Sequence, residues 1–201
     1  MSPSPQQLFV HLALLGLALA FTASARAEAP AAAAACAGCH GADGNSVAPT
    51  FPNLAGQQKK YLLRELSDYK SGKRVSELMA PLVAGLSDAD LAELASWYAK
   101  QKPAPAAASA DAALLKLGKN LYLKGNSKTD VPSCDGCHEE NGAGDGKFPR
   151  VAGQQVDYVL DQFRLYAAGK RTNGTRVMQT VAERMSEAEA RAVAEYMASM
   201  P

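Results

Sequence analysis

The sequence predicts an all-α protein built from two similar helical domains in tandem. Three observations favour this fold class: an internal repeat, apolar residues at helical spacing in both copies, and no convincing two-residue alternation of the kind that strands show. The repeat is clearest where 51–58 (FPNLAGQQ) returns as 148–155 (FPRVAGQQ). The offset drifts only from 97 (51 to 148) to 99 (86 to 185), so few insertions separate the copies.

Residues 1–27 are predicted to be a secretory signal peptide. The apolar run at 12–21 has about half of the roughly 20 residues that a membrane-spanning helix needs. Small residues at 23–27 then fit the A-x-A rule for cleavage, so Glu28 is the expected start of the mature chain. The alternative is an uncleaved anchor, because no Lys or Arg precedes the apolar run.

Two domains and a linker are expected after the signal peptide. The first domain spans 28–102 and the second spans 111–201. Residues 103–110 (PAPAAASA) offer no core-forming side chain beyond alanine and are typical of a linker. From residue 28 onward, 20 Lys and Arg balance 20 Asp and Glu, which argues against nucleic acid as a partner and against strong adsorption to anionic lipid.

Helices are predicted at equivalent places in both domains. One covers 57–71 and ends before Gly72, and its copy covers 154–168 and ends before Gly169. A capping box, in which a serine is followed three positions later by an acidic residue, starts the last helix of each domain. The pairs are Ser186 with Glu189 and, as a weaker version, Ser87 with Asp90.

Two five-residue motifs point to the chemistry of this chain. Residues 36–40 (CAGCH) and 134–138 (CDGCH) have the C-x-x-C-H pattern that marks attachment of c-type haem. Two thiols three positions apart on one helical turn can add across the two vinyl groups of one haem, and the next residue, a histidine, then lies under the iron. Covalent attachment is expected at Cys36, Cys39, Cys134 and Cys137, and iron ligation at His40 and His138.

The cysteine pairs allow three other interpretations. A thioredoxin-like thiol pair lacks the βαβ pattern around it. A zinc site would have to join two motifs that lie 98 residues apart (36 to 134), and a structural disulfide would have to close a very short loop.

The sixth ligand of each iron is predicted from the repeat. The third histidine, His11, falls in the predicted signal peptide, so methionine is the next usual ligand, and it raises the reduction potential. Met79 is the one methionine of the first domain, and Met178 is its counterpart in the second. Met79 lies seven residues before Leu86, and Met178 lies seven residues before Met185, so Leu86 and Met185 are equivalent. A position that accepts leucine is expected in the core, which argues against Met185 as a ligand. The other methionines of the second domain, Met197 and Met200, lie in its last predicted helix and have no counterpart in the first domain that could ligate iron. Pro81 suggests that Met79 lies in a loop.

Pro52 and Pro149 are the expected partners of the histidine rings. A metal-ligating histidine needs an acceptor for its other ring nitrogen, and the two Phe-Pro segments are placed to offer a backbone carbonyl. The alternative is that these prolines only fix a turn, and both roles are compatible.

With these motifs in place, the chain resembles the dihaem cytochrome c4 family, which consists of two class I cytochrome c domains in tandem. The resemblance covers the chain from about Cys36 to Tyr196. It implies one covalently bound haem c per domain, with histidine and methionine on each iron. The two domains are then expected to pack about a pseudo-twofold axis with the haem propionates facing each other.

The resemblance also implies a function. Family members are periplasmic one-electron carriers of respiratory chains, passing electrons from the quinol-oxidising bc complex toward a terminal oxidase, and some are loosely held at the inner membrane. The alternative is a cytochrome subunit that accepts electrons within a periplasmic dehydrogenase, such as a sulfide-oxidising flavocytochrome. An autonomous enzyme, such as a dihaem peroxidase, or a haem sensor would need an open iron, and the mature chain has no spare histidine for acid–base work.

The first domain departs from the family pattern at its start. Only residues 28–35, mostly alanine, precede its motif, whereas 114–123 form a fuller first helix in the second domain. There Gly118 and Tyr122 are placed to meet the last helix near Tyr196. We expect this helix–helix contact to be incomplete in the first domain, and we expect a largely unfolded chain without haem, since each domain has a small core.

Overall fold

The computed structural model describes residues 28–201, and the predicted signal peptide lies outside the described residues. Within that range the chain is helical, as predicted, and has no strand beyond an isolated bridge between Asn126 and Val131. The helices are α1 (Ala33–His40), α2 (Lys59–Lys70), α3 (Met79–Val83), α4 (Asp88–Ala99), α5 (Ala112–Lys124), α6 (Asp135–His138), α7 (Val156–Ala167), α8 (Arg176–Arg184) and α9 (Glu187–Ser199).

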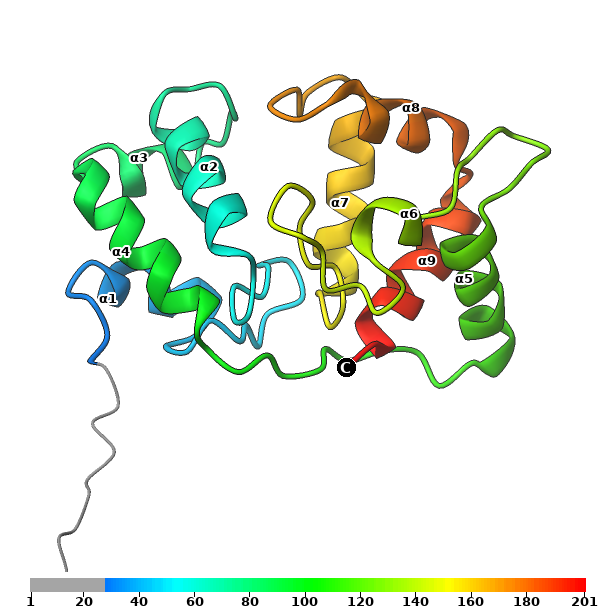
Figure 1. Ribbon diagram of the computed structural model, residues 1–201, viewed down its shortest axis with the longest axis horizontal. Helices are drawn as coiled ribbons and strands as arrows, with labels where there is room; N and C mark the ends of the chain where they lie inside the picture. Colours follow the sequence, from blue (N-terminus) through cyan, green and yellow to red (C-terminus); the bar gives the residue numbers. More distant parts are fainter. Residues whose placement is uncertain (1–27) are drawn as a thin grey trace, which may run out of the picture.

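The helices form two lobes that lie side by side (Figure 1). Helices α1–α4 make one lobe and α5–α9 make the other, and the helix-free segment between α4 and α5 runs along one edge of both. Helix α2 of the first lobe and α7 of the second occupy equivalent positions in the repeat, and both contribute side chains to the interface.

The capping boxes at the last helices are both complete. The Ser87 hydroxyl accepts from the Asp90 amide at 3.2 Å, while the Asp90 carboxylate accepts from the Ser87 amide at 2.8 Å. Ser186 and Glu189 make the same pair of bonds at 3.3 and 2.9 Å. The Ser87–Asp90 pair, the weaker match to the pattern, therefore forms a complete box because aspartate also reaches the serine amide.

The two lobes have cores of very different size. The contiguous buried cluster of the first lobe contains Ala33, Leu62, Leu94, Ala95 and Tyr98, with a few partly buried residues around it. The second core is larger because α5 packs along α9 and brings a full helix of side chains that the first lobe does not have. In the described part of the first lobe, the short α1 carries the cysteine motif itself, which confirms the expected incomplete contact.

At Gly118, α5 and α9 are in close backbone contact. A Cβ placed on Gly118 would overlap the backbone carbonyl of Ala192 and would lie 2.8 Å from the Cβ of Tyr196. Just beyond this crossing, Tyr122 is fully buried, and its ring packs edge-on against Tyr196 with centroids 5.5 Å apart. The absence of a side chain at Gly118 therefore sets how closely the two helices approach.

The repeated Gln-Gln pair, 57–58 and 154–155, holds the lobes together. Gln57 accepts from the Arg150 amide at 2.8 Å and donates to the Arg150 carbonyl at 2.9 Å. Gln154 makes the mirrored pair with Asn53, at 2.8 and 3.1 Å. Because Asn53 and Gln57 correspond to Arg150 and Gln154 in the repeat, these reciprocal bonds relate the lobes by a pseudo-twofold axis.

The second glutamine of each pair also crosses the interface. Gln58 donates to the Ala143 carbonyl at 2.9 Å, and Gln155 donates to the Ser46 carbonyl at 2.6 Å. These residues immediately precede α2 and α7, which begin at Lys59 and Val156 rather than at the glutamines. Both helices therefore start two residues later than predicted, because the glutamines bond across the interface instead of joining the helix.

Candidate functional site

A cavity of about 1300 Å³ runs through both lobes and the interface between them. Single small-molecule sites are typically about 300–1,000 Å³, so this volume suits more than one large ligand. The eight side chains predicted to attach or ligate haem all line it: Cys36, Cys39, His40, Met79, Cys134, Cys137, His138 and Met178. The structure thus brings each motif and its predicted methionine to one shared space.

Both histidines are held by the prolines that follow them. Nδ1 of His40 lies 2.9 Å from the Pro52 carbonyl oxygen, and Nδ1 of His138 lies 2.9 Å from that of Pro149. A carbonyl can only accept, so Nδ1 carries the proton, and Nε2 is left with the lone pair that a metal needs.

The surroundings of both rings favour the neutral imidazole. Burial lowers the pKa of His40 and of His138, and in each case the hydrogen bond to the proline acts more weakly in the opposite direction. Phe51 and Phe148 pack edge-on against the two rings, with centroids 6.2 and 6.1 Å apart. Each Phe-Pro pair therefore orients a histidine in the protonation state that binds iron.

The four cysteines form no disulfide, although all lie in the part of the chain that the structure describes. Burial raises the pKa of the Cys36 thiol, and it raises the pKa of Cys134 to about 12. A thioredoxin-like pair needs a lowered thiol pKa, so that reading is disfavoured. Residues 28–201 also contain no group of three or more His, Cys, Asp or Glu that could hold zinc.

The two methionines reach the cavity from short helices rather than from loops. Met79 is the first residue of α3, and Met178 lies in the first turn of α8. The prediction from Pro81 that Met79 lies in a loop was wrong. Helix α3 is a single turn, and proline is tolerated in a first turn because the N–H that it lacks would have no partner there.

The methionines set aside by the repeat argument lie in the core. Met185 packs against the second core and Leu86 against the first, as their equivalence predicts. Met197 and Met200 are buried in the second core, and Met197 also reaches the cavity. Its counterpart in the repeat is Tyr98, however, so only the positions of Met79 and Met178 offer a methionine in both lobes.

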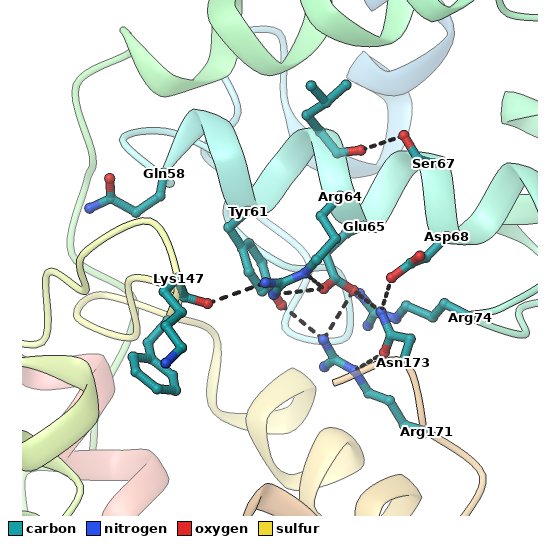
Figure 2. Close-up of polar contacts among 12 residues, drawn as sticks. Gln58, Tyr61, Arg64, Glu65, Ser67, Asp68, Arg74, Lys147, Arg171 and Asn173 are labelled. Carbon is teal, nitrogen blue, oxygen red and sulfur yellow. Dashed lines mark hydrogen bonds and ion pairs between the residues drawn. The ribbon is translucent and has the colours of Figure 1, made fainter. Parts of the chain in front are cut away.

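Two buried arginines meet where the cavity crosses the interface, a feature that no local sequence pattern predicted. Arg74 and Arg171 are 7% and 6% exposed, and both line the cavity. Glu65 lies between them, 2.6 Å from Arg74 and 3.2 Å from Arg171 (Figure 2). Guanidinium groups pair well with carboxylates, so these two residues fit the propionate groups of haem.

Comparison with known proteins identifies the family of this chain. The family model described as cytochrome c matches residues 24–102 and 115–201. Cytochrome c4 of Pseudomonas aeruginosa is 41% identical over 94% of this chain and 94% of its own length. The crystal structure of reduced recombinant cytochrome c4 from Pseudomonas stutzeri superposes with a TM-score of 0.80 at 37% identity, covering 87% of this chain and 99% of that one.

The chain belongs to the cytochrome c4 family. It is therefore a dihaem electron-transfer protein rather than an enzyme, and its two C-x-x-C-H motifs bind two covalent haem c groups. A thiosulfate dehydrogenase electron acceptor of Thiomonas intermedia is also similar, at 34% identity over 98% of this chain and 93% of its own length. No helix in the described range is long and apolar enough to cross a membrane.

Acid is expected to weaken the interface through Glu65. Burial alone would raise the pKa of Glu65, but Arg74 and Arg171 outweigh it, so the pKa lies below its ordinary value. A lowered folded-state pKa stabilises the fold above the unfolded pKa, about 4.3, and this contribution is lost as pH falls through the folded value.

Wild type should therefore exceed Glu65→Gln in free energy of unfolding at neutral pH, and this difference should shrink as pH falls below about 5. Urea unfolding of both holoproteins from about pH 7 to about pH 3 measures it. The other acidic groups are the same in both proteins, so their contributions cancel in the difference between the two free energies of unfolding. A difference that stays constant over this range would contradict the assignment.

Proposed function

We propose that this chain carries single electrons between redox partners in the periplasm, through one haem per domain ligated by histidine and methionine. The observation that carries the proposal is the equivalent placement of His40 with Met79 and of His138 with Met178 around one cavity. The domains proposed to hold the two groups are 28–102 and 111–201, joined by 103–110.

The residues of the chain prepare each site for electron transfer. When bound, haem supplies a one-electron Fe(III)/Fe(II) couple. The cysteines fix the group covalently, the proline carbonyl holds the histidine in one tautomer, and the methionine fills the position that a substrate would otherwise use. Apolar side chains such as Leu62 and Val159 line the cavity and exclude water, which favours transfer without side reactions.

Replacing either methionine by histidine should lower the potential of that domain's haem. Axial ligands set haem potentials over a span of about 0.8 V, so Met79→His and Met178→His should each shift one potential by on the order of 0.1 V or more. Potentiometric titration of the holoprotein measures this. Met185→Leu is the matched control, because its counterpart Leu86 shows that the position accepts leucine. Unchanged potentials in both histidine variants would reject the ligand assignment.

The place of the carrier in a respiratory chain is the finer part of the proposal. We assign transfer from a quinol-oxidising bc complex toward a terminal oxidase, with docking interfaces that are small and short-lived, as redox encounters usually are. Loose association with the inner membrane is compatible with this role. A purified bc complex supplied with quinol should reduce the holoprotein, and an oxidase should reoxidise it. Failure of the first reaction would reject this placement.

The second candidate is an electron acceptor within a periplasmic dehydrogenase. The similarity to a thiosulfate dehydrogenase electron acceptor favours this class, and it favours thiosulfate over the sulfide-oxidising flavocytochrome considered from the sequence. Purification from the native host separates the two candidates. A stable complex with a catalytic subunit and reduction by thiosulfate in that complex would support the second, and a free dihaem protein inert to thiosulfate would support the first.

A further inference from the structure

The cluster at the lobe interface is nearly symmetric, but the two equivalent positions that contact both buried arginines differ in charge. The repeat relates Tyr61 to Tyr158 and Arg74 to Arg171, each 97 residues apart. The same offset relates Glu65 to Gln162, so one side of the axis carries a carboxylate where the other carries a neutral amide. Glu65 therefore places a buried charge on one side of the interface, and its counterpart Gln162 on the other side is neutral.

Both side chains serve the same two guanidinium groups. Glu65 Oε2 accepts from Arg74 at 2.6 Å and from Arg171 at 3.2 Å (Figure 2). Gln162 Oε1 accepts from Arg74 at 2.9 Å and from Arg171 at 2.8 Å. Asn173 of the second lobe adds a bond to Glu65 at 2.9 Å. A glutamine can thus satisfy both arginines in this setting, and the charge of Glu65 is not needed for the hydrogen-bond pattern.

The location makes that charge effective. Glu65 is only 6% exposed and lines the same cavity as the histidines and methionines. Interactions between charges strengthen as the surrounding dielectric falls, and solvent does not screen a buried group as it screens a surface group. A nearby carboxylate favours the more positive Fe(III) form and so lowers a haem potential.

Other unequal pairs in the region are weaker candidates. Arg64 corresponds to Asp161, but both side chains reach solvent, at 38% and 54% exposure. Asp68 is buried and corresponds to Leu165, but its carboxylate does not line the cavity. Solvent screens the first pair, and Asp68 lies outside the cavity that the predicted iron ligands share.

We propose that Glu65 makes the two haem sites electrostatically unequal and so contributes to the difference between their reduction potentials. The proposal rests on the proposed function, in which each domain holds one haem. Glu65 extends from α2 of the first lobe and its counterpart on α7, Gln162, is neutral, so we expect its field to differ at the two sites, and position 162 stands in the mirrored relation to them. Moving the carboxylate to position 162 should exchange its effects on the two haems.

Three holoproteins test this: wild type, Glu65→Gln, and the double variant Glu65→Gln with Gln162→Glu. The double variant keeps the net charge of wild type and changes only the side of the axis that carries it. Each potential is measured by titration followed with NMR signals assigned to the individual haems. Thermal unfolding of all three holoproteins checks that the interface is retained.

The expected result for Glu65→Gln is a rise in both potentials by unequal amounts. In wild type the carboxylate lowers the reduction potential of one haem more than that of the other, and in the double variant this order should be reversed. Unchanged potentials in Glu65→Gln, equal rises at both haems, or a double variant that keeps the wild-type pattern would each overturn the proposal. The methionine–iron charge-transfer band is recorded in every protein: its presence with unchanged potentials rejects only the role of Glu65, and its absence in wild type rejects the proposed ligation.

Discussion

A chain with alanine at all four motif cysteines, purified without haem, is expected not to reach the folded state described above. Its helices would have to enclose a cavity of about 1300 Å³. Much of its lining is apolar, so without haem these side chains would be exposed to water or the helices would collapse onto one another, and both outcomes abolish the native arrangement. Domains of this size are stable by only about 5–15 kcal/mol, so we expect the loss of the apolar contacts with haem to exceed the stability that remains.

Near-ultraviolet circular dichroism and urea unfolding test this expectation. The haem-free chain should show no fixed aromatic signal and no cooperative transition, whereas the holoprotein should show both. Variants with alanine at only one motif serve as internal controls. Loss of haem from the second domain alone should leave the first with its small core and little independent stability. A sharp cooperative transition in the haem-free chain would show that the helices pack without the cofactor.

Gly118→Val should prevent the second domain from packing. The new side chain would overlap the Ala192 carbonyl, which is backbone of α9 and cannot turn aside as a side chain could. The helices would have to separate, and Tyr122 and Val193, both fully buried, would lose their contacts. Overpacking of a core typically costs about 1–3 kcal/mol, and a forced separation of two helix backbones should exceed that range.

The measurement is thermal unfolding of the holoprotein, followed at the second-domain haem. Gly85→Ala is the matched control, because a Cβ at Gly85 meets nothing within 4 Å and the residue does not have a positive φ. Gly118→Val should unfold at a much lower temperature or fail to retain ordered haem in the second domain, while Gly85→Ala should resemble wild type. Equal unfolding temperatures for all three proteins would show that the helix crossing does not depend on Gly118.

Local patterns in the sequence predicted most of the site. The C-x-x-C-H motifs are contiguous, and the Phe-Pro segments follow them closely, so the proline carbonyls beside His40 and His138 could be expected from spacing alone. The methionines needed the repeat, because a lone methionine has no local signature. Comparing positions 79 and 178 with their surroundings supplied that information, and both side chains line the cavity.

The contacts between lobes could not be predicted in the same way. The Gln-Gln pair was visible as a repeated motif, but Gln57 bonds to Arg150 at a separation of 93 residues, and no local pattern specifies such a partner. Glu65 falls within the predicted helix 57–71 with no sequence feature to distinguish it, and only the packing of the lobes places it between Arg74 and Arg171. The position of Met79 at the start of a helix was not predicted, because a proline two residues later is as typical of a loop as of a single-turn helix.

The most direct test of the account is an optical spectrum of the oxidised holoprotein, followed by addition of carbon monoxide after reduction. Two histidine–methionine sites predict a methionine–iron charge-transfer band of full intensity for two haems and no uptake of carbon monoxide. Half of that intensity, or rapid binding at one iron, would mean that Met79 or Met178 does not ligate. That result would contradict a carrier with two closed sites.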